Sequence, residues 1–595
     1  MKSPTHAQWT WLLTLGPLAT AILMLGRVWF HPHDMVGYDQ FANARVLANA
    51  VDYLAHPGSA PWSWPAEAPA CQTDHCIGLA LLNWPFRVCA LEPVFGMWCT
   101  TVVILALNGT LLGVLLRRWG IAPGAALCAA VLAVSLPVLI QRLMHTNNLE
   151  MCWILAWVLA VDYFAEKPAV LRALFLGIAG IGLAIQPGTV LQFTAPLVPL
   201  LAIVVHGQRP LSVRAGAVAA AVHLPALALM AWIYEPFVTH PYPPNYIIPS
   251  PVQDLLRPLG EVAWTLRTGQ LADNVATPGP VPVIGVIGLI IGVVVNHRRR
   301  LAGGLLVAVV VCALCGLTFG GGGVIDLLRH LPLYGGMRSP GRFLVPACVL
   351  SLAGLAVVVD LALARRRPGF AVAVIALAVG GQVLVDGGPV APLLLLRSVH
   401  IPVEDVAAHA RPGPVCGIPA GFLDDAVAVE TGRITVGTSL GIPYGWPDRL
   451  DVCNNAQDGE GVALVILALQ RQGLAGVVVD HRYAMPGIDG VLTKLGAREV
   501  KTASPLISWW ELPPAAPGVW ASRVEMGRDG AGNWQVAFLG DPGAAPVEGM
   551  IIGNGVRLAV LPLLPGTAPY GYVLPPGPQA PVLRLSREMP VMVKQ

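Results

Sequence analysis

The chain has 595 residues and a formal net charge of +3, with 55% hydrophobic residues, 12% charged residues and a mean hydropathy of +0.64. A soluble globular domain carries about 25% charged residues, so the composition excludes a soluble enzyme, a disordered protein and a coiled coil. The net charge is too small to favour nucleic acid as a partner.

Apolar segments that approach the length of a membrane-crossing helix, about 20 residues, recur over the first two thirds of the chain. They are 9–30, 93–116, 121–140, 149–164, 171–186, 189–206, 213–233, 281–296, 301–319, 343–364 and 369–385. The first segment is too long for a cleaved signal peptide and is not followed by small residues. We therefore expect an α-helical polytopic membrane protein with about eleven spans.

The basic residues sort by loop, which predicts the orientation of the spans. With the N-terminus inside, every inner loop after the first span is short and basic, as the positive-inside rule requires. These loops hold Lys2, Arg117, Arg118, Lys167, Arg172, Arg209, Arg214, Arg298, Arg299, Arg300, Arg365, Arg366 and Arg367. Eleven crossings from an inside start place the C-terminal region outside. The preference for Arg over Lys, with abundant Ala, Gly, Val and Pro, indicates a bacterial source.

The predicted spans are poor in charge, and their few ionisable residues lie near the ends. Asp162, Arg172 and Asp360 fall close to the inner ends, and no paired acidic residues occupy a midplane. Pumps and transporters usually place such groups within their spans. The pattern therefore counts against ion-coupled transport and favours chemistry at the outer surface.

The first outer loop, 31–92, opens with two imidazoles and two carboxylates. They are His31, His33, Asp34 and Asp39. Such a group could bind a divalent cation or supply an acid/base pair, and the alternative is a solvated loop with turns enforced by proline. The apolar spacing of 42–55 predicts a helix lying on the membrane surface.

An inside start, a large acidic first outer loop, about eleven spans and an outer C-terminal region resemble the GT-C superfamily of membrane glycosyltransferases. The resemblance implies transfer of a sugar from polyprenyl phosphate or pyrophosphate at the outer face. It also implies that an acidic residue of the first outer loop activates the acceptor. Asp39 and Asp34 match that residue by position. Both stay open as candidates, with Asp39 preferred because it opens the surface helix.

The segment 331–343 resembles a Leu-Pro…Arg-x-Pro-x-Arg-Phe stretch that precedes a late span in bacterial members of this superfamily. The resemblance implies that Arg338 and Arg342 bind the phosphate of the donor, since guanidinium groups bind phosphate bidentately and stay charged. His330 would extend the same basic patch. The alternative is that both Arg side chains reach lipid headgroups.

Two further outer loops supply candidate substrate contacts. His145 and Glu150 lie in a polar segment before the fourth span, where the alternative is a turn that caps the span. Tyr242 lies in a Pro- and Tyr-rich loop after the seventh span, where aromatic rings suit sugar faces or prenyl chains. The first loop has no Asp-x-Asp pair. No cofactor is required by the sequence, and a divalent metal ion stays an open alternative.

We divide the chain into a transmembrane domain, 1–390, an outer small α/β domain, 391–513, and an outer β-rich, sandwich-like module, 514–595. The α/β prediction rests on helical and strand-like patterns, and the module on strand-like runs between Gly and Pro turns. The helical patterns are 462–472 and 492–495, and the strand-like runs are 475–480, 507–512, 534–539, 557–561 and 582–585.

The cysteines of the outer regions predict disulfides in an oxidising periplasm. Cys71 and Cys76 could close a hairpin, and Cys416 could pair with Cys453. A zinc site at Cys71, His75 and Cys76 is the alternative for the first pair, although it lacks a fourth ligand.

The resemblance implies a glycosyltransferase of the bacterial cytoplasmic membrane that takes a polyprenyl-phosphate-linked sugar and passes it to a glycan, lipid or protein acceptor. Its other partners would be membrane lipids. The alternative from a different class is a non-catalytic membrane assembly or glycan-binding protein on the same scaffold, since a fold does not fix a function. A lipid transporter ranks third because the spans are apolar.

Overall fold

The computed structural model describes most of the helical region and parts of the C-terminal region. The described residues are 6–30, 44–45, 47, 77–140, 149–186, 188–239, 279–317, 323–328, 330–331, 334, 340–386, 411–420, 422–431, 433–436, 450, 454–471, 473–500, 502, 505–514, 520–528, 533–541, 548–553, 556–562, 570–574, 582–585 and 591–593. Contacts divide the chain into two compact units. Unit 1 comprises Met1–Ala60 and Pro69–His400, and unit 2 comprises Pro61–Ala68 and Ile401–Gln595.

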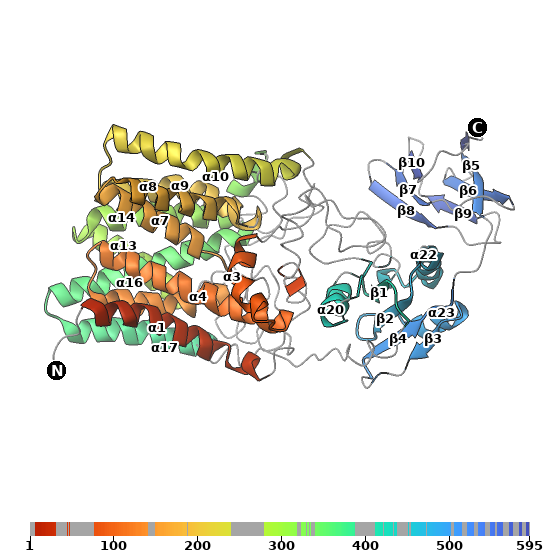
Figure 1. The fold of residues 1–595 in the computed structure, drawn as a ribbon, viewed down its shortest axis with the longest axis horizontal. Helices are drawn as coiled ribbons and strands as arrows, with labels where there is room; N and C mark the ends of the chain where they lie inside the picture. The colour runs from red at the N-terminus through yellow and green to blue at the C-terminus, as the bar shows by residue number, and fades with distance from the viewer. Residues whose placement is uncertain are drawn as a thin grey trace. The chain divides into compact units, whose positions relative to one another are not determined.

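Unit 1 is a bundle of helices that lie side by side (Figure 1). Each of the eleven apolar segments coincides with a helix, so the hydropathy pattern is confirmed as helical structure. The helices are α1 (His6–Met24), α4 (Pro93–Arg118), α5 (Pro123–Val134) with α6 (Pro137–Ile140), α7 (Cys152–Glu166), α8 (Val170–Ala184), α9 (Gly188–Gln208), α10 (Val213–Thr239), α13 (Pro280–Val294), α14 (Arg299–Gly316), α16 (Leu344–Ala364) and α17 (Pro368–Asp386).

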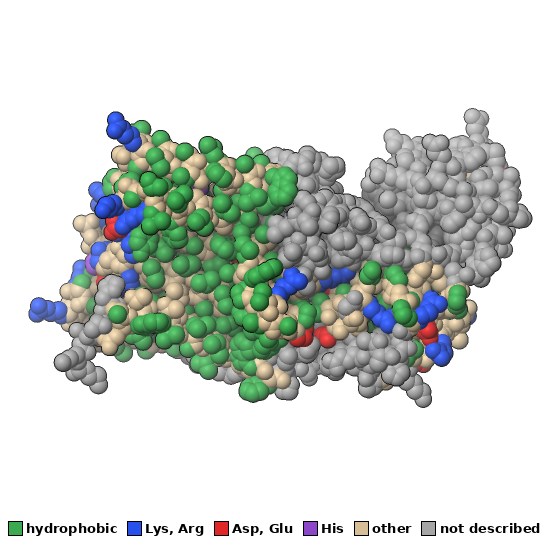
Figure 2. Space-filling model, viewed as in Figure 1, with side chains coloured by type: hydrophobic (Ala, Val, Ile, Leu, Met, Phe, Trp, Pro, Cys, Tyr) green, Lys and Arg blue, Asp and Glu red, His purple; other side chains and the backbone are tan. Residues whose placement is uncertain are grey.

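Four helical segments in the described part of the chain are long and apolar enough to cross a membrane by length and composition. They are Pro93–Arg118, Val213–Ile233, Arg299–Gly316 and Gly341–Ala364. Figure 2 shows hydrophobic side chains covering the flank of this bundle, as expected of a surface that meets lipid. The number of crossings and their orientation stay predictions.

Shorter elements lie between these helices: η1 (Gly26–Trp29), α3 (Ile77–Val88), α15 (Val324–Leu328) and η5 (Pro340–Phe343). The sequence did not predict α3. Of the surface helix expected at 42–55, Ala44, Arg45 and Leu47 are helical and buried, and the rest lies outside the described residues.

Close helix packing in unit 1 depends on glycine. A side chain on Gly354 of α16 would collide with the carbonyl oxygen of Gly285 in α13, and one on Gly288 would collide with the carbonyl oxygen of Gly354. Small residues let helix backbones approach in this way, and dispersion contacts then replace the hydrophobic effect that lipid cannot supply. Helix α16 also contacts α5, α14 and α17, which makes it the central helix of the bundle.

Local sequence explains where several helices begin. Proline occupies the first turn of α4, α5 and α13, where its missing N–H is not needed. Glu92 caps α4 because its carboxylate accepts hydrogen bonds from the backbone N–H groups of Val94 and Phe95, both at 2.8 Å. A carboxylate at this position also favours the positive end of the helix dipole.

Unit 2 contains a four-stranded sheet in the order β1-β2-β4-β3. Strands β1 and β2 are parallel, and β4 is antiparallel to both β2 and β3. The elements are β1 (Val415–Ile418), α20 (Phe422–Thr431), α22 (Gly459–Arg471), β2 (Gly476–Asp480), α23 (Ile488–Lys494), β3 (Arg498–Val500) and β4 (Ile507–Glu511). The predicted helices at 462–472 and 492–495 and strands at 475–480 and 507–512 are confirmed as α22, α23, β2 and β4.

Seven further strands form two sheets, β11-β5-β6-β9 and β10-β7-β8. They are β5 (Trp520–Arg528), β6 (Trp534–Asp541), β7 (Glu548–Gly553), β8 (Val556–Pro562), β9 (Tyr570–Leu574), β10 (Val582–Leu585) and β11 (Val591–Val593). The strand-like runs at 534–539, 557–561 and 582–585 therefore form strands. Packing of the two sheets as a sandwich stays a prediction, as do the three domain boundaries.

The predicted Cys416–Cys453 disulfide is wrong. Cys416 is a free thiol, fully buried in strand β1. Burial raises the pKa of the Cys416 thiol well above its usual range, and the nearby carboxylate of Asp424 adds to the effect. Cys416 therefore behaves as a small core residue. Cys71, Cys76 and Cys453 lie outside the described residues.

Candidate functional site

The structure describes three of the eight predicted site residues: Glu150, His330 and Arg342. The other five lie outside the described residues. They are Asp34, Asp39, His145, Tyr242 and Arg338. The roles of all eight residues stay predictions. The structure gives the surroundings of Glu150, His330 and Arg342.

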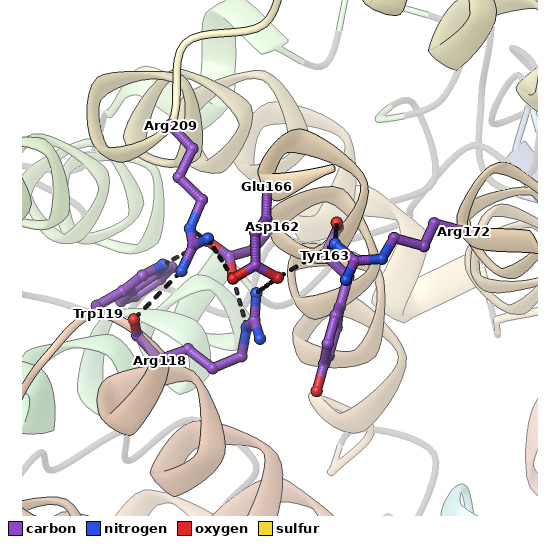
Figure 3. A network of polar contacts seen from close by, with 7 residues as sticks. All are labelled: Arg118, Trp119, Asp162, Tyr163, Glu166, Arg172 and Arg209. Carbon is purple, nitrogen blue, oxygen red and sulfur yellow. Dashed lines mark hydrogen bonds and ion pairs between the residues drawn. The ribbon is translucent and has the colours of Figure 1, made fainter. Parts of the chain in front are cut away.

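One end of the bundle is held by a network around the buried carboxylate of Asp162 in α7 (Figure 3). This carboxylate accepts from Nε of Arg118 at 2.6 Å, from Nε of Arg209 at 3.0 Å and from the indole N–H of Trp119 at 3.2 Å. Asp162 is fully buried, so its charge is balanced by two guanidinium groups and a third donor. A buried carboxylate requires such pairing.

Glu166, one helical turn further along α7, contacts the same arginines (Figure 3). Its carboxylate pairs with Arg209 at 2.9 Å, with Arg172 at 3.1 Å and with Arg118 at 3.2 Å. The guanidinium of Arg118 also lies 3.7 Å from the centre of the Tyr163 ring. The network therefore joins the loops after α4, α7 and α9.

A second network extends the first across the bundle. Asp360 of α16 accepts from the backbone N–H of Ala122 at 2.8 Å and pairs with Nε2 of His297 at 2.9 Å. Arg298 pairs with Asp360 and also donates to the carbonyl oxygen of Gly120. The short loop 119–122 thus contacts both networks, and the basic loops predicted to be inner lie at one end of the bundle.

Figure 2 shows Lys and Arg side chains gathered at that end. We name it the basic end. The carboxylates described there are all paired with basic side chains, so the charges of this end hold helices together.

Glu150 lies at the opposite end of the bundle. It directly precedes the first turn of α7, whereas Asp162 and Glu166 of the network lie in the last turns of the same helix. Arg342 lies at the same end, because α16 runs from Leu344 to Ala364 and carries Asp360 near its far terminus. A helix of that length spans about 30 Å. We name this the polar end.

Glu150 is fully buried beside the start of α3. The backbone there is fixed by two hydrogen bonds, from Nδ2 of Asn108 to the Leu149 carbonyl at 2.8 Å and from the Gly78 N–H to the Ile185 carbonyl at 3.0 Å. A methyl group on Gly78 would lie 3.2 Å from Oε2 of Glu150 and 3.0 Å from Nε1 of Trp153. A carboxylate and an indole N–H therefore face the same glycine.

Further polar side chains lie within this half of the bundle. The buried amide of Gln186 accepts from the Thr194 hydroxyl at 3.0 Å, and the buried amide of Asn83 donates to the Thr100 hydroxyl at 2.9 Å. Such groups are costly in an apolar surrounding unless hydrogen-bonded. Each pair joins neighbouring segments, Gln186 after α8 with α9 and α3 with α4, so these groups contribute to the packing of the polar end.

The 3-10 helix η5 presents Arg342 at the start of α16. Phe343 is buried against Gly316, and the Tyr334 ring stacks on the Phe343 ring with centroids 6.5 Å apart. Burial, with smaller contributions from Cys315 and Cys312, raises the pKa of Tyr334 to about 12. Arg342 itself is half-buried, whereas His330 is exposed. The backbone that carries Arg342 is thus anchored by aromatic packing.

A metal site is not formed by the described residues, among which no group of three or more His, Cys, Asp or Glu side chains could hold an ion. The imidazoles and carboxylates of 31–39 lie outside those residues, so a divalent cation there stays a prediction.

Comparison with known proteins gives a fold. No protein-family model matches the chain, and no curated protein matches it. Among solved structures, the chain is similar to the arabinofuranosyltransferase AftD from Mycobacteria, with a TM-score of 0.53 and 14% identity over 88% of this chain and 42% of that chain. The chain therefore shares the fold of AftD.

The resemblance to the GT-C superfamily is therefore confirmed at the level of fold. A second solved structure, ArnT from Cupriavidus metallidurans bound to undecaprenyl phosphate, has a TM-score of 0.48 and 12% identity over 86% of this chain and 100% of that chain, which is too low to support an argument. The chain spans less than half of the AftD chain, so its activity, donor and acceptor are matters for proposal.

Sequence reasoning missed Trp153 and Gly78, which the structure brings to Glu150. Trp153 lies inside an apolar segment, where nothing in the local pattern separates a ring that packs against lipid from one that faces a carboxylate. Gly78 belongs to α3, whose apolar stretch, 77–88, is too short to read as a span.

Proposed function

We propose that this GT-C protein is a membrane glycosyltransferase that moves a sugar from a polyprenyl-phosphate donor to an acceptor at the outer face of the bacterial cytoplasmic membrane. The observation that carries the proposal is the fully buried carboxylate of Glu150 at the polar end, in a bundle with a GT-C fold. The paired charges of the basic end support the same assignment, because they leave the polar end for chemistry.

In the proposed reaction an acceptor hydroxyl attacks the anomeric carbon of the donor sugar. The bond from that carbon to the phosphate oxygen breaks, and polyprenyl phosphate leaves with the bonding electrons. Asp39 or Asp34 takes the proton of the acceptor hydroxyl as general base. This geometry favours inversion through an oxocarbenium-like state, as in glycoside chemistry.

The phosphate would be held by Arg338 and Arg342, with His330 extending the basic patch. Support comes from the half-buried position of Arg342 on the anchored helix η5, since a partly desolvated guanidinium binds phosphate more strongly than an exposed one. Glu150, His145 and Tyr242 would contact the sugars. A divalent cation could be held by the carboxylates and imidazoles of the first outer loop.

Orientation follows from the basic end, which we assign to the cytoplasmic side by the positive-inside rule. The polar end then faces the periplasm. Unit 2, which follows the polar-end terminus of α17, would be periplasmic as well. Its α/β region, 391–513, and β-rich module, 514–595, would serve acceptor or partner binding.

The test is transfer by the full chain in proteoliposomes supplied with radiolabelled sugars on undecaprenyl phosphate. Removing a general base costs about 10²- to 10⁴-fold, so Asp39→Asn or Asp34→Asn should lose at least that much. Asp326→Asn is a matched control, because Asp326 is also acidic and outer but caps α15 through the Gly323 N–H. Full activity in both first-loop variants would defeat the base assignment.

A wild-type chain that binds the lipid-linked sugar but transfers none of a donor panel would support the non-catalytic alternative instead. Washing with EDTA and adding back Mg²⁺ or Mn²⁺ decides the metal question within the same assay.

A further inference from the structure

Two short loops at the basic end each carry three successive arginines. Residues 298–300 join α13 to α14, residues 365–367 join α16 to α17, and all six are exposed. The loops are neighbours, because α13 packs along α16 and Arg298 of the first loop pairs with Asp360 near the end of α16. We name these six arginines the arginine patch.

The positive charge of the arginine patch is largely uncompensated. Within the part of the chain that the structure describes, Arg298 pairs with Asp360, and the other five side chains have no ion pair or hydrogen bond. The three arginines of the network around Asp162, by contrast, share two carboxylates (Figure 3). That network holds helices together, whereas the arginine patch is open to an anion from outside the chain.

The backbone of the arginine patch is unusual for arginine. Helix α16 ends in a Schellman motif, in which the N–H of Arg367 donates to the Ala362 carbonyl at 2.8 Å. Arg366 in this motif has a left-handed φ of 55°, at a position that glycine usually takes, as Gly120 does after α4. Arg298 also has a left-handed φ, of 54°. Such conformations are unfavourable for a residue with a side chain and gather at functional sites. Two arginines held in this way indicate a use for their side chains.

Exposed apolar side chains border the arginine patch on the helices that it joins. Val294 ends α13, and Phe370 and Val372 lie near the start of α17, each more than half exposed. Figure 2 shows the basic side chains of this end next to the hydrophobic flank of the bundle. A ligand that suits both surfaces has an anionic head and apolar chains.

We propose that the arginine patch binds the phosphate headgroup of an anionic phospholipid in the leaflet at the basic end. Guanidinium groups bind phosphate bidentately and stay charged, and basic residues at membrane level attract anionic lipids. The acyl chains then lie against the exposed apolar residues, which a soluble phosphate would leave uncovered. The inference concerns the opposite end from the proposed transfer site and does not depend on the proposed function.

The test measures lipid binding to the purified full chain in detergent, by native mass spectrometry during titration with phosphatidylglycerol or phosphatidylcholine. The wild type should bind phosphatidylglycerol at least about tenfold more tightly, because each basic residue near an anionic lipid contributes roughly fivefold in affinity. Arg299→Gln combined with Arg366→Gly should lower the affinity for phosphatidylglycerol roughly thirtyfold. Lys167→Gln combined with Arg214→Gln is the matched control, since it removes two exposed charges from other loops of the basic end.

The control should change the affinity by less than about threefold. Equal losses in the two double variants would overturn the inference, because the charge of the whole end and no local site would then attract the lipid. Equal binding of the two lipids by the wild type would overturn it as well. Millimolar glycerol phosphate should leave the lipid bound, and displacement would show a site for a soluble phosphate instead.

Arg366→Gly alone separates binding from folding. Glycine suits the left-handed backbone, so this variant should keep or raise its thermal midpoint without added lipid while its affinity for phosphatidylglycerol falls roughly fivefold. A lower midpoint with unchanged affinity would overturn the inference, since Arg366 would then serve the fold. None of these measurements uses sugar transfer, so their outcome and that of the proposed function are separate.

Discussion

Asp162 and Glu166 bind the same arginines but differ in burial, which makes them a test of what holds the basic end together. The Asp162 side chain is fully buried, whereas the Glu166 side chain is 39% exposed. Removing one partner of a buried pair costs about 3 to 5 kcal/mol because the remaining charges lose their compensation. An exposed pair contributes about 0 to 1 kcal/mol. Asp162→Asn should therefore destabilise unit 1 several times more than Glu166→Gln.

The expected shift in thermal midpoint follows from the size of the unit. An unfolding entropy of about 2.1 cal/mol/K per residue makes 1 kcal/mol worth roughly 1 °C for a unit of about 390 residues. We expect a midpoint about 3 to 5 °C lower for Asp162→Asn and at most about 1 °C lower for Glu166→Gln.

A thiol-reactive fluorophore reports this unfolding, because Cys152, Cys312 and Cys348 are buried in the bundle. The measurement is made in detergent at low and high salt. High salt should remove the small effect of Glu166→Gln and leave that of Asp162→Asn, since buried pairs are screened much less. Equal shifts for the two variants would refute the claim that burial decides the contribution of each carboxylate.

Three further outcomes can be measured on the same protein. Gly354→Val should prevent folding of the bundle, because its side chain would meet the Gly285 carbonyl, whereas Gly380→Ala on α17 has open space and should elute as the wild type by size exclusion. Cys416 should resist alkylation by iodoacetamide at pH 8, whereas the exposed Cys89 should react. Burial raises the pKa of the Cys416 thiol, and the reactive thiolate forms only at a pH near or above that pKa. Mass spectrometry measures the alkylation of both residues. In intact cells, with Cys71, Cys76, Cys89 and Cys453 replaced by Ser, an impermeant maleimide should label His330→Cys and spare Arg366→Cys, and the reverse pattern would overturn the predicted orientation.

The helices were predictable because hydropathy is a local property. Each apolar segment coincides with a helix, and Pro93, Pro123 and Pro280 already mark three helix starts in the sequence. The missed elements are those with weak local signals, such as the short helix α3 and strand β1, whose four residues lie between breaks. The same holds in unit 2, where α22 and β2 were predicted because the spacing of their apolar residues is clear.

The candidate site was less predictable because it depends on tertiary contacts. Glu150 stood out as an acidic residue at the end of an apolar segment, and its burial agrees with a role beyond a solvated turn. Trp153 gave no signal, because only the fold brings its indole against Gly78 and Gly182. The pairing of Asp360 with Arg298 and His297 was equally hidden, although the sequence did place Asp360 near an inner end.

The two ends of the bundle divide charge and polarity in a way that bears on mechanism. At the basic end, the carboxylates of Asp162 and Asp360 join the loops that follow α4, α9 and α13 through ion pairs and hydrogen bonds. At the polar end, the buried carboxylate of Glu150 and the indole of Trp153 pack against Gly78, where the absence of a side chain lets α3 and α7 approach closely. The paired charges of the basic end thus hold the bundle together through ion pairs, whereas the polar end is held by close packing and by the hydrogen bond from Asn108 to the Leu149 carbonyl.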